Sequence, residues 1–244
     1  MLRRQEYAAD RDRKIGENDF AALSKKYFTS AVGKETPGFE KVKLDQSQPR
    51  VRMLFKETEQ THVALGLHGL CRTHPDKHAL SIVNIILGAN MSSRLFHIVR
   101  DEMALCYEIS SSIRRYDDCG AFVISAGVDD KKLAKTLEIV LKELARIKDE
   151  PVGREELRRA KEYYKGQLLF ALEDTMSRML WLGEKIISGE KDFSTRQILE
   201  RIEAVRPEDL MRVSKGIFTN KNLNLSIIGP VKDEKAIKEI LNIR

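Results

Sequence analysis

His74 and His78 have the spacing in this sequence that most resembles a metal site, because side chains four residues apart on a helix share a face and could bind one zinc ion. Pro75 and Asp76 are residue types that begin helices, so His74 is expected before the helix and not one turn below His78. Lys77 stands where a zinc hydrolase carries its glutamate base, and its charge opposes a metal. The motif therefore favours two surface histidines over a pair of ligands.

Other local patterns give little support to hydrolytic or phosphate chemistry. The serines at 110–112 lie within a predicted strand, without the strand-to-helix glycine elbow of a hydrolase, so a solvated strand face is preferred. Gly88 is the only glycine of the turn at 87–93, and the turn lacks the lysine of a P-loop. His62 and His68 share one face of a predicted strand and could meet a third ligand, but isolated histidines are more often ordinary polar residues on a sheet face.

Arg100 and Tyr107 form the remaining chemical candidate. Arg100 is predicted in the last turn of a helix and Tyr107 at the start of the next strand, so a short reversal could bring guanidinium and phenol to one surface. An arginine can equally satisfy the carbonyls at a helix end, and a tyrosine can anchor a strand. Chemistry alone therefore leaves the pair unspecific.

The composition indicates an ordinary globular protein. The 244 residues are 42% hydrophobic and 33% charged, with only 6 prolines and 14 glycines. Lysine and arginine number 43 against 37 acidic residues, so the net charge of +6 is a small excess. The basic run at 154–165 is interleaved with Glu155, Glu156 and Glu162, as in a helix surface laced with salt bridges. We expect no nucleic-acid partner.

The sequence also predicts no membrane residence. No apolar stretch reaches the roughly 18 to 20 residues of a membrane span, and the first residues lack the apolar core of a secretory signal. Cys71, Cys106 and Cys119 are odd in number and scattered, which favours reduced thiols. The expected location is therefore cytoplasmic.

Hydrophobic periodicity predicts an α+β domain over residues 50–244, with a mainly antiparallel sheet packed against helices. Gly88 is placed as a helix C-cap, and Ser194 with Gln197 as a capping box. Residues 1–30 are predicted to form a helical N-terminal arm with little to pack on locally, and residues 31–49 a linker. The predicted strands are 51–55, 63–67, 107–113, 121–128 and 223–228; the predicted helices are 79–87, 95–102, 133–147, 154–172, 176–187, 194–204, 207–218 and 233–241.

The region from His74 to Tyr107 resembles the second half of pitrilysin or insulinase type zinc peptidases, a family that includes mitochondrial processing peptidase and its bacterial relatives. The resemblance extends over about residues 20–242 and implies one α+β domain of that fold. It is carried by four runs: Leu87-Gly88, Ser92-Ser93-Arg94-Leu95-Phe96, Arg100-Asp101-Glu102 and Leu105-Cys106-Tyr107. They are similar to the family's Leu-Gly, Ser-Ser-Arg-Leu-Phe, Arg-Glu-Lys and Gly-Leu-Ala-Tyr.

The resemblance implies a non-catalytic half. The family's zinc motif, an inverted His-x-x-Glu-His, belongs to the first half and is absent here. The chain is therefore expected to bind no cofactor itself, to be inactive alone, and to need a homologous half or subunit that bears the zinc ligands. The implied substrate is a peptide or an unfolded protein segment. The arm at 1–30 resembles the last helix of a missing first half.

By the same resemblance, Arg100 and Tyr107 reach the partner's zinc site, contact the substrate and support the tetrahedral intermediate; no residue of this chain is expected to be catalytic on its own or to bind metal. Glu102 departs from the family's basic residue, Cys106 from its alanine and Ala104 from its glycine. A turn with positive φ would strain an alanine at 104. The alternative function is a structural or assembly subunit of the same fold, without a role in proteolysis.

Overall fold

The computed structural model describes residues 16–27, 38–190 and 194–243. The chain divides into two compact units, Met1–Lys41 and Val42–Arg244. In the first unit, helix α1 (Glu17–Tyr27) has acidic residues in its first turn and basic residues in its last, which complements the helix dipole. Residues 1–15 and 28–30 of the predicted helical arm and residues 31–37 of the predicted linker lie outside the described residues.

The second unit is built on a five-stranded sheet in the order β1-β5-β2-β4-β3. Three of its four pairings are antiparallel, and only β1 and β5 run parallel, which confirms the predicted α+β fold with a mainly antiparallel sheet. The strands β1 and β2 follow each other in the chain but do not pair, because β5 lies between them. The strands are β1 (Arg50–Phe55), β2 (Thr61–Gly69), β3 (Cys106–Arg115), β4 (Gly120–Val128) and β5 (Asn224–Gly229).

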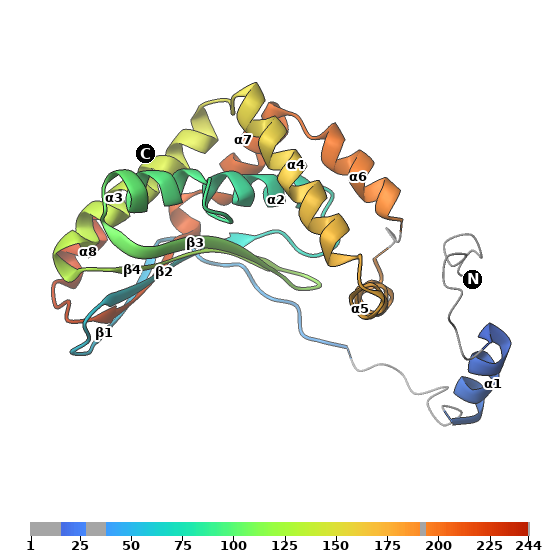
Figure 1. The fold of residues 1–244 in the computed structure, drawn as a ribbon. Coiled ribbons are helices and arrows are strands. Elements are labelled where there is room, and N and C mark those ends of the chain that lie inside the picture. Colours follow the sequence, from blue (N-terminus) through green and yellow to red (C-terminus); the bar gives the residue numbers. More distant parts are fainter. Residues whose placement is uncertain (1–15, 28–37, 191–193, 244) are drawn as a thin grey trace. The chain divides into compact units, whose positions relative to one another are not determined.

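The larger helices lie over one face of this sheet (Figure 1). Alternate residues of β2 point into the core beneath them, where Val63, Leu65 and Leu67 are buried, whereas His62 is exposed on the opposite face. Burial of each such side chain stabilises the fold by about 1.5–3 kcal/mol. The helices are α2 (Lys77–Leu87), α3 (Leu133–Asp149), α4 (Arg154–Ala171), α5 (Thr175–Ile187), α6 (Thr195–Ala204), α7 (Pro207–Ile217) and α8 (Glu234–Ile240).

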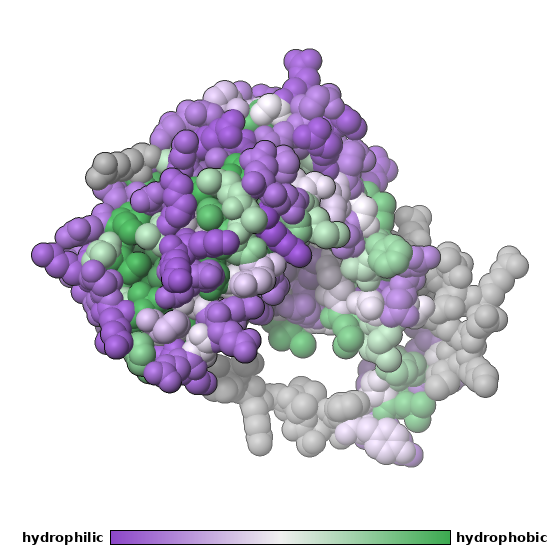
Figure 2. Space-filling model, turned by 60° about the vertical axis from the view of Figure 1, so that its left-hand side comes forward, coloured by the Kyte–Doolittle hydropathy of each residue, from purple (hydrophilic) through white to green (hydrophobic). Residues whose placement is uncertain are grey.

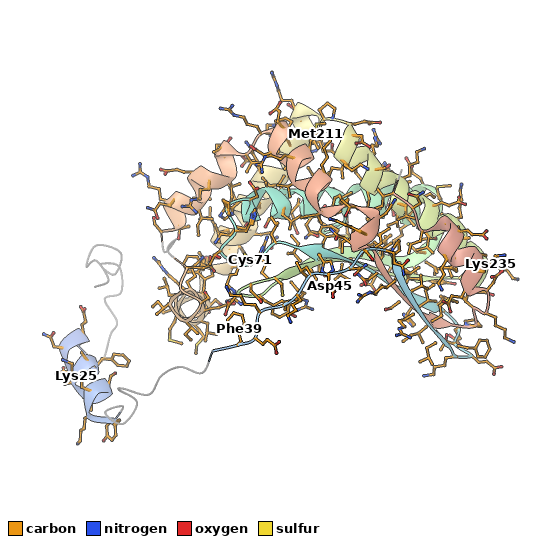
Figure 3. All side chains as sticks on the ribbon, turned by 180° about the vertical axis from the view of Figure 1, so that it is seen from behind. Lys25, Phe39, Asp45, Cys71, Met211 and Lys235 are labelled. Carbon is orange, nitrogen blue, oxygen red and sulfur yellow. The ribbon has the colours of Figure 1, made fainter. Side chains whose placement is uncertain are left out.

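An irregular segment leads into β1 and is held to the sheet by hydrogen bonds. The backbone N–H of Val42 donates to Asp118 Oδ2 at 2.8 Å, and Gln46 Nε2 donates to the carbonyl oxygen of Leu223 at 2.9 Å. Figure 3 shows Asp45 on this segment and Met211 in the helical layer. Residues 42–48 therefore belong structurally with the second unit.

The surface is largely polar on one face, and the start of α6 lacks the predicted capping hydrogen bond. Figure 2 shows a face on which hydrophilic residues predominate, in keeping with the 33% of charged residues. Ser194 is the N-cap of α6, but its side chain makes no capping hydrogen bond, so the predicted capping box is not formed. In the described part of the chain, no helix combines the length and the apolar character needed to cross a membrane.

Candidate functional site

Gly88 brings the end of α2 against β3. The Ser111 N–H donates to the Gly88 carbonyl oxygen at 2.9 Å, and the Ser111 hydroxyl donates to Asn84 Oδ1 at 2.7 Å. A Cβ at Gly88 would lie 2.7 Å from Ser111 Oγ and 2.8 Å from its backbone nitrogen. Gly88 is the C-cap as predicted, but its φ of −164° is extended, so close approach and not a left-handed turn requires glycine. Ser111 is buried, which corrects its assignment to a solvated face.

Arg94 fixes the segment that precedes Arg100. Its guanidinium donates to both carboxylate oxygens of Glu156 on α4, at 2.8 and 2.7 Å, and lies 3.7 Å from Glu143 Oε2 on α3. A bidentate arginine–carboxylate pair restrains orientation as well as distance. The arginine of the Ser-Ser-Arg-Leu-Phe run therefore anchors this segment to two helices.

Arg100 lies on a helix of unusual type. The segment Phe96–Glu102, labelled η3, is a π-helix, whereas the sequence predicted an α-helix there. The Met103 N–H continues its wider hydrogen-bonding pattern by donating to the Ile98 carbonyl oxygen at 3.1 Å. The Arg100 side chain is exposed, with its guanidinium carbon 4.7 Å from the centroid of the Phe96 ring.

The turn after η3 holds Ala104 in the left-handed region. Its φ is 46°, and no other described residue except glycine has a positive φ. The turn is closed on both sides, since the Leu105 N–H donates to the Val99 carbonyl oxygen at 2.8 Å and Lys132 Nζ donates to that of Ala104 at 2.9 Å. The chain thus keeps the conformation that the family's glycine would adopt without strain.

Tyr107 lies at a β-bulge, at the start of β3. In the pairing with β4, Cys106 lies opposite Val128 and Glu108 opposite Gly127, so Tyr107 has no partner in the register. Bulges redirect side chains and often occur beside functional sites. The Tyr107 side chain is 62% exposed. The sequence predicted the strand but not this bulge.

Arg100 precedes and Tyr107 follows the turn at Ala104, and Cys106 lies between them in the sequence. Burial raises the pKa of the Cys106 thiol, and the positive charge of Arg100 acts in the opposite direction. Among the described residues, no hydrogen bond joins Arg100 to Tyr107. Both side chains are exposed and so can reach a bound molecule.

The histidines do not assemble into a metal site. His74 precedes α2, as predicted, and its Nδ1 accepts a hydrogen bond from the Asp76 N–H at 3.1 Å. His78 is buried, with Nδ1 3.2 Å from the Tyr164 hydroxyl, so its assignment as a surface residue is wrong. In residues 16–27, 38–190 and 194–243, no cluster of three or more histidine, cysteine or acidic side chains could hold a metal ion.

A charged cavity is the feature that the sequence patterns did not reveal. It is lined by residues from α2, α4 and α5, and by Arg114 and Arg115 at the end of β3. The adjacent arginines were the one available signal, but the acidic residues around them in the sequence gave no reason to expect a net positive cavity.

Comparison with known proteins identifies the family. The profile of the peptidase M16 inactive domain matches residues 14–164. An uncharacterised zinc protease of Streptomyces coelicolor is 34% identical over 187 residues, which cover 77% of this chain and 40% of that protein. The chain belongs to the M16 peptidase family, and its matched region corresponds to the inactive domain.

Solved structures share the fold at lower identity. The crystal structure of a peptidase M16 inactive domain from Pseudomonas fluorescens has a TM-score of 0.78 and 20% identity, and the match covers 91% of this chain and 53% of that one. A chain of Complex III2 from Candida albicans has a TM-score of 0.71 and 18% identity over 93% of this chain and 57% of that one. This chain thus spans about half the length of such proteins.

Proposed function

We propose that this chain is the substrate-binding, non-catalytic half of a zinc metalloendopeptidase whose zinc ligands lie on a homologous half or subunit. Membership of the M16 family and the match to its inactive domain support a non-catalytic peptidase half. The described residues do not fit a zinc ion, so we assign the metal to the partner. The proposed substrate is a peptide or an unfolded protein segment.

The observation that carries the finer proposal is the exposed Tyr107 on its bulge, one short turn after the exposed Arg100. Hydrogen-bond donors stabilise an oxyanion best when they are fixed before charge develops. Arg94 and the closed turn at Ala104 restrain the backbone that carries both donors. The phenol and guanidinium would donate to a peptide carbonyl oxygen as it becomes tetrahedral, without moving a proton themselves.

The proposal is tested by reconstitution with a zinc-bearing M16 half. Tyr107→Phe and Arg100→Ala should each lower kcat for peptide cleavage by about 100-fold or more, the usual effect of losing one oxyanion donor. Association of the two halves should be unchanged, because both side chains are exposed and make no hydrogen bond to each other. Tyr116→Phe is the matched control, since this tyrosine is also exposed but lies at the far end of β3. Cleavage at the wild-type rate by both variants would rule the role out.

A structural or assembly subunit is the second candidate. The occurrence of this fold in a chain of Complex III2, together with alanine in place of the family's glycine at 104, favours it. It predicts that the reconstituted pair assembles but that no variant at Arg100 or Tyr107 alters cleavage. The same experiment therefore separates the two functions.

Two further features are part of the proposal. The three described cysteines are free thiols, which suits the reducing cytoplasm. The exposed apolar residues of α1, Phe20, Leu23 and Tyr27, suit a helix that completes the packing of a preceding half. Fusing the zinc-bearing half ahead of α1 should lower the exposure of these side chains to hydrogen-exchange or oxidative labelling.

A further inference from the structure

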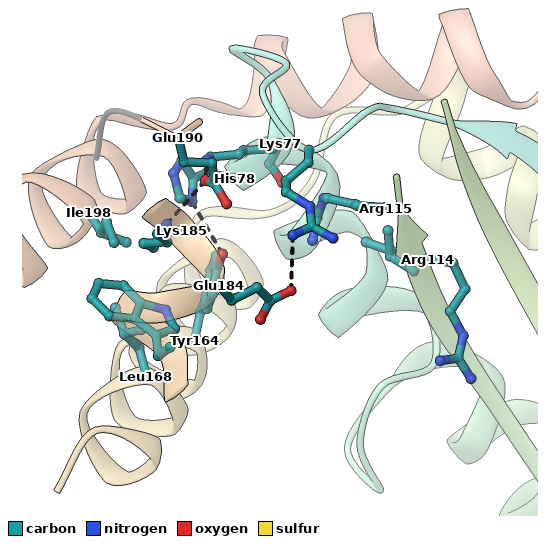
Figure 4. Close-up of a pocket in the computed structure, with 13 residues that line it drawn as sticks. Lys77, His78, Arg114, Arg115, Tyr164, Leu168, Glu184, Lys185, Glu190 and Ile198 are labelled. Atoms are coloured by element: carbon teal, nitrogen blue, oxygen red, sulfur yellow. Dashed lines mark hydrogen bonds and ion pairs between the residues drawn. The ribbon is translucent and has the colours of Figure 1, made fainter. Parts of the chain in front are cut away.

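A cavity of about 420 Å³ opens where the start of α2, the end of β3, α4 and α5 meet (Figure 4). Its size is typical of a ligand pocket. Cationic side chains outnumber the two carboxylates of its lining, Glu184 and Glu190. The cations come from four separate stretches of the chain: Arg72, Lys77, Arg114, Arg115 and Lys185.

Glu190 is shared between two lysines in this lining. Its Oε2 accepts hydrogen bonds from Lys77 Nζ and, at 3.1 Å, from Lys185 Nζ. Burial acts to raise the pKa of the Glu190 carboxyl, but the hydrogen bonds from Lys77 and Lys185 outweigh it and the pKa is lowered. All three side chains are nearly buried, with exposed fractions of 9 to 11%. The Glu190 carboxylate is therefore held between two lysine ammonium groups away from bulk water.

Arg115 adds a third positive charge at the same place. Its Nη2 donates to the Lys77 carbonyl oxygen at 2.9 Å and to Ser81 Oγ at 2.8 Å, both neutral acceptors. Its Nε is buried and has no hydrogen-bond partner. No carboxylate of the described residues forms an ion pair with it, and Glu184 is paired instead with Arg72 at 3.0 Å. A mostly buried cation whose hydrogen bonds go to neutral acceptors is costly, so this geometry favours binding of an anion.

The cavity also has apolar walls. Leu168, Trp181 and Tyr164 contribute these walls, and Lys185 Nζ lies 4.8 Å from the centroid of the Trp181 ring. Inorganic phosphate would complement the cations alone. A carboxylate on an organic body would complement both parts, because arginine binds a planar carboxylate through two parallel hydrogen bonds.

We propose that this cavity binds a carboxylate carried by a peptide, either the C-terminal carboxylate or an acidic side chain. The inference deepens the proposed function, on which it rests, by naming a chemical class of substrate. The ligand carboxylate pairs with the Arg115 guanidinium, and the adjoining residue packs against the aromatic wall. Arg100 and Tyr107 have no part in this contact and are not in the lining.

The test is calorimetric titration of the full chain with three probes. These are an unstructured decapeptide without acidic side chains and with a free C-terminal carboxylate, its C-terminal amide, and the amide with one internal glutamate. Inorganic phosphate forms a separate arm at matched ionic strength. At least one carboxylate peptide should bind about ten-fold or more tighter than the neutral amide, as expected for charge-assisted hydrogen bonds. Equal binding of all three peptides, or binding of phosphate alone, would overturn the proposal.

Variants identify the cavity as the site. Arg115→Gln should abolish the preference for the carboxylate, and Arg114→Gln, at an exposed position that tolerates substitution, should weaken it several-fold. Arg196→Gln removes the same charge from an exposed position outside the cavity and should leave the preference intact. A preference that survives in folded Arg115→Gln and Arg114→Gln contradicts the assignment.

The same titrations distinguish this inference from the function on which it rests. Arg100→Ala and Tyr107→Phe should keep the carboxylate preference whatever they do to cleavage. If cleavage proves insensitive to those variants while the preference depends on Arg115, the catalytic-support role fails and the cavity stands. If cleavage needs them while the peptides bind equally, the cavity fails alone.

Discussion

Ala104 is the only residue other than glycine, among those described, whose backbone φ is positive. A left-handed backbone costs an L-residue about 1–2 kcal/mol, and the turn retains that conformation with a φ of 46°. The hydrogen bonds from Leu105 and Lys132 across the turn offset this cost. The strain is therefore held locally, between the two side chains proposed to contact the substrate.

Replacing Ala104 with glycine should stabilise the protein. Relief of the left-handed strain exceeds the additional unfolded-state entropy of glycine, so we expect a gain of about 0.5–1 kcal/mol and a rise in Tm of a few degrees. Ala134→Gly, on the exposed face of α3, is the matched control and should lose about 0.5–1 kcal/mol. Thermal and urea unfolding measure the change in stability of both variants. A loss of stability in Ala104→Gly similar to that of the control would refute the strain.

Asp76 gives stability a pH dependence. It occupies the N-cap position of α2 without a capping hydrogen bond from its side chain, and its carboxylate accepts two hydrogen bonds from Arg212 on α7, at 2.6 and 2.8 Å. The Arg212 hydrogen bond lowers the pKa of the Asp76 carboxyl below its usual 3.8, against the effect of burial. A lowered folded-state pKa contributes stability that is complete above the unfolded value and is lost as pH falls towards the folded value.

Arg212→Gln should therefore lower the free energy of unfolding at pH 7 by no more than about 1 kcal/mol, because Arg212 is half exposed and screened by solvent. The difference from wild type should shrink as pH falls below 3.8 and Asp76 is protonated. Urea unfolding between pH 7 and pH 3 measures this difference in the free energy of unfolding. A difference that is independent of pH would contradict the ion pair, and Arg196→Gln controls for loss of one surface charge.

At the scale of elements, contact between the end of α2 and β3 sets the position from which the chain turns towards Arg100. Gly88→Ala should force Ser111 away, because the new Cβ would lie 2.8 Å from its backbone nitrogen. Overpacking of this kind costs about 1–3 kcal/mol. Gly166→Ala in α4 has open space around it and should gain about 0.5–1 kcal/mol. The midpoints of urea unfolding test both variants. An unchanged midpoint in Gly88→Ala would show that the close approach of Ser111 does not require glycine at position 88.

The sequence predicts helices and strands correctly where a hydrophobic pattern continues over many consecutive residues. The stripe of α3, from Leu133 to Ile147, and the alternation around the turn before Gly120 predict their structures correctly. The insertion of β5 between β1 and β2 was not predictable from local pattern, because it pairs residues 158 to 174 positions apart in the sequence. The π-helix and the bulge at Tyr107 add one residue to a regular pattern, which leaves hydrophobic spacing nearly unchanged.

The candidate site likewise has parts that the local sequence predicts and parts that it does not. Arg100 and Tyr107 were identified from motif order, and the strain at Ala104 followed from one substituted glycine. The cavity around Arg115 could not be identified from the sequence. Its residues Lys77, Arg115 and Lys185 come from three separate elements and converge only in the folded chain. Such convergence depends on how the helices pack on the sheet, so it produces no periodic pattern in the sequence.

At the scale of the whole molecule, the chain has the fold of an M16 peptidase domain, and its described residues assemble no set of metal ligands. A catalytic zinc site needs about three protein ligands and an open position. His78 is committed to Tyr164 and His74 to the Asp76 N–H, and the described residues hold no suitable cluster. The purified chain should therefore contain well under one zinc ion per molecule.

The same chain should not cleave an unstructured peptide, with or without a chelator, because its described part assembles no set of ligands that could hold a metal ion and so activate water. Adding a zinc-bearing M16 half should produce cleavage that the chelator abolishes, while the zinc-bearing half alone serves as the control. Stoichiometric zinc with chelator-sensitive cleavage by this chain alone would overturn the assignment of the metal to a partner. It would return His62, His68, His74 and His78 to consideration as ligands, and Arg100 and Tyr107 would then need a site within their own chain.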